Sequence, residues 1–166
     1  EEALIARAGD IRRLFEKIGL SVSSSLQTLH KGLSKGKKAI ICDIDGTLTD
    51  EHAYKEPWGW VSGGSGSPPV QAALSALKKM KGVEVHYLTG RPMSIKSATQ
   101  DLLEHYGVPG SNNLHVRPEM MSVEEHKKNV TSELAKKFDI VASIGNGLSE
   151  EKAAKNEGIP FVKIGA

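Results

Sequence analysis

The chain has 166 residues, of which 39% are hydrophobic and 25% charged, and its formal net charge is +2. The length fits one globular domain with an appendage, and the charge is too mild to indicate nucleic-acid binding by itself. No apolar stretch approaches the ~20 residues of a membrane span and no signal peptide is visible, so we expect a cytoplasmic protein without a membrane partner. Because the chain begins with Glu1 rather than Met, we also expect a fragment or a processed product.

Residues 1–37 show helical spacing of apolar side chains on both sides of Gly19. The apolar positions are Leu4, Ile5, Ala8, Ile11, Phe15 and Ile18, and then Val22, Leu26, Leu29 and Leu33. This spacing predicts a helical hairpin with one apolar face, which we treat as an appendage to a domain spanning residues 38–166. The face either packs onto the chain's own core, forms a homo-oligomer or docks a partner.

The apolar run 39–42 predicts a buried strand, and Asp43 and Asp45 follow it immediately. Gly46 then predicts a turn at the carboxyl end of the strand, which is the edge where open α/β sheets bind ligands. Two carboxylates held this close repel each other and need a cation or a proton between them. Magnesium suits them, because it prefers hard oxygen ligands and phosphate. Cys42, the only cysteine, is expected to be a buried, inert thiol.

An insert at about residues 48–69 carries Trp58 and Trp60. It is too short for a large domain that closes over the site, but it is long enough for a hairpin flap. The two indole rings either stack on a base or sugar of a bulky substrate or pack the flap against the protein. Residues 62–67 read Ser-Gly-Gly-Ser-Gly-Ser, a composition typical of a flexible linker, natural or engineered.

A β-rich run from Val83 ends in Thr89-Gly90-Arg91, and Pro92 is expected in the first turn of the following helix. Thr89 is then a candidate N-cap for that helix, and the Gly90 N–H can approach a ligand closely because no side chain intervenes. Arg91 either contacts the substrate or is an ordinary surface arginine.

The rest of the chain alternates helices and strands, which is typical of an α/β fold with a parallel sheet. A capping box of Ser122 and Glu125 marks the start of one helix, and Lys127 falls on its apolar stripe with Lys128 beside it. A lysine on such a stripe needs an anionic partner or must extend to solvent. The predicted helices cover residues 70–77, 95–106, 122–138 and up to 156, and the predicted strands cover 114–116, 139–144 and 160–164.

These segments together resemble the haloacid dehalogenase-like (HAD) superfamily, in a capless or minimal-cap form. The resemblance rests on Asp43 to Thr47, on Thr89-Gly90, on a lysine in the helix from Ser122 and on Gly145 to Glu151. It implies a Rossmann-like three-layer fold whose central parallel sheet has the strand order 3-2-1-4-5. The match is altered at its fourth part, where Asn146 replaces the commoner Asp and Glu150 or Glu151 supplies the second acid.

The resemblance implies that Asp43 is the nucleophile and that Asp45 protonates the leaving group and then activates water. It further implies that Thr89, Gly90 and a lysine hold the phosphoryl oxygens, and we choose Lys127 over Lys128. The implied cofactor is Mg²⁺, with Asp43, Asp45, Asn146 and Glu150 around it. Asn146 removes one formal charge from this set, so we expect weaker metal binding than in the commoner pattern.

The implied activity is magnesium-dependent hydrolysis of a phosphomonoester through a phospho-aspartate. Two alternatives stay open: a noncatalytic binding or regulatory module, and an enzyme resembling polynucleotide 3′-phosphatases. The substrate is expected to be phosphorylated and possibly bulky, and Arg91, Trp58 and Trp60 are its candidate contacts. We interpret the six histidines as ordinary residues, because they show no metal-ligand spacing.

Overall fold

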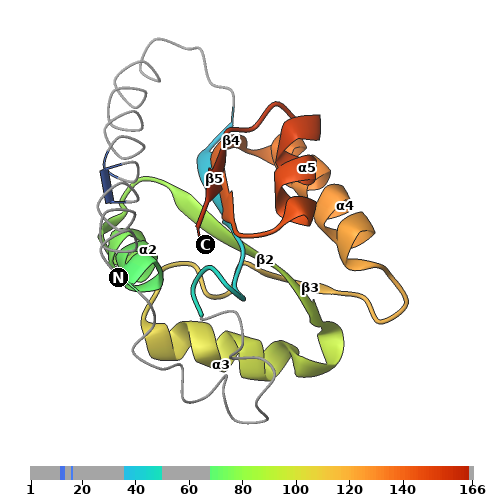
Figure 1. Cartoon of the computed structure of the whole chain (residues 1–166), viewed down its shortest axis with the longest axis horizontal. Helices are drawn as coiled ribbons and strands as arrows, with labels where there is room; N and C mark the ends of the chain where they lie inside the picture. The colour runs from blue at the N-terminus through green and yellow to red at the C-terminus, as the bar shows by residue number, and fades with distance from the viewer. Residues whose placement is uncertain (1–11, 14–15, 17–35, 50–67, 165–166) are drawn as a thin grey trace.

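The computed structural model describes residues 12–13, 16, 36–49 and 68–164 (Figure 1). Of the predicted hairpin, Arg12, Arg13 and Glu16 are helical and Gly36 and Lys37 are not, and the other residues lie outside the described ones. The flap with Trp58 and Trp60 and the Gly/Ser segment also lie outside them. The predictions for these parts, including the boundary between the appendage and the domain, therefore stay predictions.

The centre of the fold is a five-stranded sheet with all neighbours parallel, in the order β3-β2-β1-β4-β5. This confirms the predicted order 3-2-1-4-5 and places β1 in the middle. Its strands are β1 (Lys38–Cys42), β2 (Glu84–Pro92), β3 (Leu114–Arg117), β4 (Asp139–Gly145) and β5 (Phe161–Lys163).

Helices cover both faces of the sheet, which confirms the three-layer architecture (Figure 1). Side chains of β1 alternate between two cores: Ile40 and Cys42 join one, and Ala39 and Ile41 join the other. The first core includes α2 (Pro68–Lys79) and α3 (Lys96–Tyr106), and the second includes α4 (Val123–Lys137) and α5 (Leu148–Asn156). None of the described helices combines the length and apolarity that a membrane crossing requires.

Local sequence signals set several helix ends. The Ser122 side chain accepts a hydrogen bond from the Glu125 N–H at 3.1 Å, so the predicted N-cap of α4 is confirmed. Gly107 ends α3 with φ +66°, a conformation that glycine adopts without a steric penalty. Both signals act within one turn of helix, so they can be recognised in the sequence.

The end of β2 differs from the prediction. Pro92 is not in the first turn of a helix: it is extended (φ −70°, ψ 158°), is the last residue of β2 and precedes a short 3₁₀ helix, η2 (Met93–Ile95). The helix α3 starts only at Lys96, with Ile95 as its N-cap, so Thr89 is not a helix cap. The strand continues because Pro92 still pairs with Arg117 of β3, a contact between distant parts of the chain.

Candidate active site

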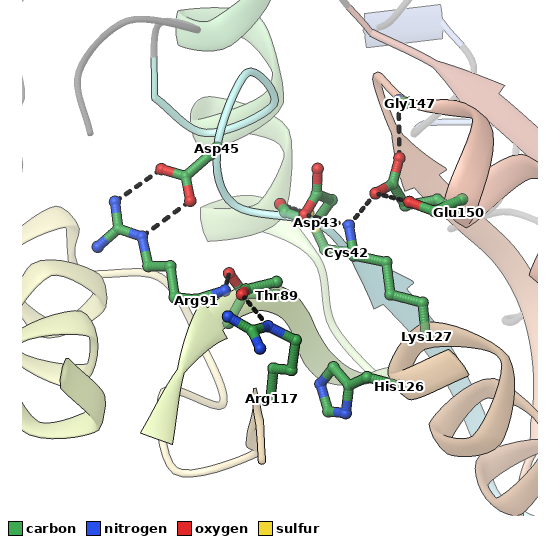
Figure 2. A network of polar contacts seen from close by, with 12 residues as sticks. Cys42, Asp43, Asp45, Thr89, Arg91, Arg117, His126, Lys127, Gly147 and Glu150 are labelled. Atoms are coloured by element: carbon green, nitrogen blue, oxygen red, sulfur yellow. Dashed lines mark hydrogen bonds and ion pairs between the residues drawn. The ribbon is translucent and has the colours of Figure 1, made fainter. Parts of the chain in front are cut away.

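The carboxyl ends of β1, β2 and β4 meet at one edge of the sheet, and the predicted site residues follow these strands. Asp43 follows β1, Thr89 lies near the end of β2, and Asn146 follows β4. Figure 2 shows Asp43, Lys127 and Glu150 grouped together, with Asp45 turned toward Arg91 beside them. The sheet order accounts for this convergence, because β1 pairs with both β2 and β4.

Asp43 is buried, with 5% of its surface exposed. Its backbone N–H donates to the Ile144 carbonyl at 2.9 Å, which fixes the residue to the end of β4. Burial raises the pKa of the Asp43 carboxyl, and the charge and hydrogen bond of Lys127 act against this rise. The preceding Cys42 is buried as predicted, and burial raises the pKa of its thiol.

Lys127 supplies the positive charge beside Asp43. It is 4% exposed, its Nζ lies 3.2 Å from Asp43 Oδ1, and it forms a second ion pair with Glu150. Lys128 is exposed. The helix α4 packs against α5 and β2, so the apolar stripe that holds Lys127 faces the site, and the lysine meets two carboxylates there.

Glu150 is buried in the first turn of α5 and faces inward. Its Oε2 accepts from the Gly147 N–H at 2.7 Å, and Ser149 Oγ donates to its Oε1 at 3.0 Å. A Cβ atom at Gly147 would lie 2.7 Å from Glu150 Oε2, so this carboxylate occupies space that only a glycine leaves free. Glu151, the alternative acid, instead pairs with Lys155 at 3.4 Å.

Asp45 faces away from Asp43 and is held by Arg91. Arg91 Nε donates to Asp45 Oδ2 at 2.8 Å and Nη2 donates to Oδ1 at 2.7 Å. Arg91 is 6% exposed and is therefore not a surface arginine. Thr99 of α3 and Thr49 lie beside the pair, at 3.5 Å from Arg91 Nη1 and 3.4 Å from Asp45 Oδ1. Arg91 as a substrate contact stays a prediction.

Two residues near Thr89 were missed by the sequence analysis. Arg117 Nε donates to the Gly90 carbonyl at 3.0 Å, and His126 Nε2 lies 3.2 Å from the His115 carbonyl (Figure 2 shows both side chains beside Thr89). His126 is buried and precedes Lys127 in α4. The only indication in the sequence that His126 belongs to the site is its position next to Lys127. The sequence gives no such indication for Arg117.

The site brings together three carboxyl groups, those of Asp43, Asp45 and Glu150, and two cationic side chains, those of Lys127 and Arg91. Asp43 and Glu150 share Lys127, whereas Asp45 and Arg91 neutralise each other. The Asn146 side-chain amide lies against the turn that follows β1. Its Nδ2 is so close to Gly46 that a Cβ at Gly46 would lie 2.0 Å from it. Thr47 Oγ1 is a buried hydroxyl that has no hydrogen-bond partner among the described residues. Within the described ranges no three His, Cys, Asp or Glu side chains gather as metal ligands.

A sequence profile of the HAD superfamily, subfamily IIIB (acid phosphatase), matches residues 5–165. The chain therefore belongs to this family, and it is a phosphatase of the phosphomonoesterase class. No curated protein sequence matches the chain with significance.

Solved structures share the fold at low sequence identity. The class C acid phosphatase from Bacillus anthracis is 19% identical, with a TM-score of 0.58 over 95% of this chain and 78% of that one. A crystal structure of the Bacillus anthracis class C acid phosphatase with tungstate bound is 20% identical, with a TM-score of 0.57 over 95% and 78%. A chain of the Pnkp1/Rnl/Hen1 RNA repair complex is 20% identical, with a TM-score of 0.61 over 80% of this chain and 44% of that one.

Proposed function

We propose that the protein hydrolyses phosphomonoesters with the help of Mg²⁺ and through a phospho-aspartate at Asp43. The observation that carries this proposal is the buried Asp43 carboxylate at the end of the central strand, with the Lys127 ammonium 3.2 Å away. A carboxylate in that position is shielded from water and faces a cation able to attract a phosphoryl group. Family membership favours catalysis over the noncatalytic alternative.

In the first half of the reaction, an Asp43 carboxylate oxygen attacks phosphorus and the bond from phosphorus to the ester oxygen breaks. Asp45 must first exchange its ion pair with Arg91 for a proton. In this protonated form it gives its proton to the departing oxygen, so the alcohol leaves neutral. In the second half Asp45 removes a proton from water, and the resulting nucleophile attacks the phospho-aspartate. Inorganic phosphate leaves and both carboxyl groups return to their starting state.

The phosphoryl oxygens need positive charge and hydrogen-bond donors at the same edge of the sheet. Lys127 provides the charge, and Thr89 and Gly90 provide the hydroxyl and backbone donors of the β2 end. Thr89 is buried, and its Oγ1 accepts from the Arg91 N–H at 3.1 Å. The hydroxyl proton is thereby left for a phosphoryl oxygen.

The residues present fit a small divalent cation. Mg²⁺ prefers hard oxygen ligands together with water. The site offers such oxygens in the carboxylates of Asp43 and Glu150, the side-chain amide of Asn146 and the backbone carbonyl of Asp45. Glu150 already bonds to Lys127 and to the Gly147 N–H, so we assign it to the outer ring of the metal site. When bound, Mg²⁺ would neutralise charge on the transferring phosphoryl group.

The test measures phosphate release from a broad panel of phosphomonoesters, with and without Mg²⁺. Wild type is compared with Asp43→Asn and with Asp101→Asn, a matched control because Asp101 is exposed on α3. We expect magnesium-dependent release by wild type and by the control, and loss of release in Asp43→Asn. Turnover by Asp43→Asn at the wild-type rate would contradict the phospho-aspartate mechanism.

A polynucleotide 3′-phosphatase activity is the second candidate. Its structural support is the fold similarity to a chain of an RNA repair complex, at 20% identity. The panel therefore includes an oligonucleotide with a 3′-phosphate and the same oligonucleotide with a 5′-phosphate. Selective release from the 3′ end, with binding that weakens steeply as salt rises, would support this candidate. Use of the N-terminal helices for oligomerisation or docking stays a prediction, as do the substrate contacts of Trp58 and Trp60.

A further inference from the structure

The phosphate-binding end of β2 is a bulge. Leu88 pairs with His115 and Pro92 pairs with Arg117, so Thr89, Gly90 and Arg91 face the single residue Val116 of β3. Extra residues in one strand leave backbone donors and acceptors without partners in the ladder. Buried groups of this kind need partners from elsewhere, so the bulge keeps its shape only if side chains supply them.

Side chains of three residues bond to the backbone of the bulge and its neighbour. Thr89 Oγ1 accepts from the Arg91 N–H at 3.1 Å, and Arg117 Nε donates to the Gly90 carbonyl at 3.0 Å. His126 Nε2 lies 3.2 Å from the carbonyl of His115, the β3 residue at which the regular pairing ends. Burial lowers the pKa of His126, and its hydrogen bonds to the backbones of His115 and Thr89 act against this fall.

The same contacts join the bulge to the start of α4, which carries Lys127. Arg117 Nη1 donates to the Met121 carbonyl at 2.9 Å and to the Glu119 carbonyl at 3.4 Å. The methyl groups of Val123 lie 3.1 Å from the position of a Cβ at Gly90, so the first turn of α4 packs directly on the glycine. Among the described residues Arg117 forms no salt bridge with a carboxylate, and its bonds go to backbone carbonyls.

We infer that Arg117 and His126 are positioning residues that hold the Thr89–Gly90 bulge in the shape that binds the transferring phosphoryl group. The inference rests on the proposed function and adds two residues that act through the backbone rather than by touching the substrate. Arg117 binds the Gly90 carbonyl and Thr89 Oγ1 binds the Arg91 N–H, so together they orient the Gly90–Arg91 peptide plane, which directly follows the Gly90 N–H. His126 fixes the adjoining backbone and couples it to the helix that presents Lys127 to Asp43.

The first test observes the Gly90 N–H itself. Thr89-Gly90 is the only Thr-Gly pair in the sequence, so labelling the carbonyl carbon of threonine and the nitrogen of glycine selects one amide resonance by NMR. Inorganic phosphate is titrated into the wild-type protein with Mg²⁺ present. We expect this resonance to shift in a saturable way. A resonance that does not move while phosphate demonstrably binds would overturn the inference, and this measurement needs no variant.

The second test uses substitutions. At Arg117, substitution by Gln removes the charge and the paired N–H donors (Arg117→Gln), whereas substitution by Lys keeps the charge (Arg117→Lys). At His126, His126→Leu removes the hydrogen bonds, whereas His126→Gln keeps an N–H donor. Lys136→Gln is the control, because Lys136 is exposed in the last turn of α4. For each variant we would measure the Kd for phosphate by calorimetry, the position of the Gly90 resonance, kcat, KM and Tm.

We expect Arg117→Gln and His126→Leu to weaken phosphate binding and lower kcat/KM by about 10- to 100-fold, the range that misplacement of binding groups produces. Arg117→Lys should recover little, because one ammonium group cannot reach both the Gly90 and Met121 carbonyls, and His126→Gln should recover most of the loss. Wild-type phosphate affinity in Arg117→Gln and His126→Leu, with only a lower Tm, would overturn the inference. Full recovery by Arg117→Lys would also overturn it, because charge alone would then explain the effect.

Failure of this inference and failure of the proposed function are distinguishable. If wild type hydrolyses phosphomonoesters with Mg²⁺ and Asp43→Asn does not, the proposed function stands whatever the Arg117 variants do. If wild type releases no phosphate from any ester, the proposed function fails, and the Gly90 titration still reports whether the bulge binds phosphate.

Discussion

Arg91 holds the carboxylate of Asp45 with two hydrogen bonds, 2.8 Å from Nε to Oδ2 and 2.7 Å from Nη2 to Oδ1. A bidentate guanidinium–carboxylate pair fixes orientation as well as charge. Arg91 belongs to the β2 bulge and Asp45 to the turn after β1, so the bulge controls the direction in which the proposed acid points. The two functions that we propose for the site, phosphate binding and proton transfer, would therefore both depend on the same strand end.

Arg91→Lys keeps a positive charge but cannot form the fork with Asp45. We expect kcat to fall by about 10-fold or more for alkyl phosphates, up to the roughly 10²- to 10⁴-fold that general acid catalysis contributes. The fall should be smaller for a nitrophenyl phosphate, whose leaving group departs without a proton. Steady-state kinetics on both ester types measure this difference. An equal loss on both, with a raised KM, would instead indicate that Arg91 binds the substrate directly.

Lys127→Met removes the cation between two buried carboxylates, whereas Lys128→Met removes an exposed one. We expect Lys127→Met to abolish measurable phosphate release and to lower the free energy of unfolding by about 3–5 kcal/mol, because unpaired buried charge is left behind. Lys128→Met should stay within about 0.5 kcal/mol of wild type, as surface substitutions usually do. Urea unfolding and phosphate release compare the two. A comparable loss in both variants would speak against Lys127 as the site cation.

Asn146→Asp restores a carboxylate where the chain has an amide, with almost no change of shape. The added charge repels Asp43 when no metal is present, so the Tm without metal should fall. Because Mg²⁺ binding is favoured by the same charge, the rise of Tm on adding Mg²⁺ should be larger than in wild type. Thermal unfolding across a Mg²⁺ titration measures both effects. An unchanged response to Mg²⁺ would place the metal away from Asn146.

Gly46→Ala and Gly158→Ala form a matched pair. Both glycines have positive φ, +77° and +67°, but a Cβ at Gly46 would lie 2.0 Å from Asn146 Nδ2 and one at Gly158 would meet nothing within 4 Å. Gly158→Ala should cost only the backbone strain, about 1–2 kcal/mol. Gly46→Ala should cost more and should also impair phosphate release, because Asn146 must move. Equal stability and activity of the two variants would contradict this contact.

His115 should make stability depend on pH. Burial and the neighbouring His86, whose Nδ1 is 3.0 Å from His115 Nε2, lower the pKa of His115 from 6.5 to about 4. His126, Lys96 and Lys137 act in the same direction. Between these pH values the unfolded chain binds the extra proton, so the stabilisation present above about pH 6.5 is lost as the pH falls toward 4.

The expected loss is ~1–2 kcal/mol after allowance for the partial exposure of His115. Urea unfolding at several pH values measures it, with His115→Gln expected to flatten the curve. The control is His105→Gln, since His105 is exposed on α3. A curve that keeps its slope in His115→Gln would assign the pH dependence to other groups.

Much of the fold was predictable because its signals are local. The start of α4 followed from Ser122, which acts within one helical turn, whereas the strand order followed from the family resemblance. The end of β2 was mispredicted for the opposite reason. Proline is common in the first turn of a helix, but here the pairing of Pro92 with Arg117 keeps the chain extended. The residues next to Pro92 in the sequence give no indication of that pairing.

The sequence by itself determined which side chains reach the carboxyl edge of the sheet, because strand ends and motif spacing place Asp43, Asp45, Thr89 and Asn146 there. Only the tertiary structure decided how they are partnered: Glu150 on Lys127, Arg91 on Asp45, and Arg117 on Gly90. These partners lie on different strands and helices. Their contacts depend on how the elements pack and on which backbone groups a bulge leaves unpaired. Neither property can be predicted from a local pattern of residues.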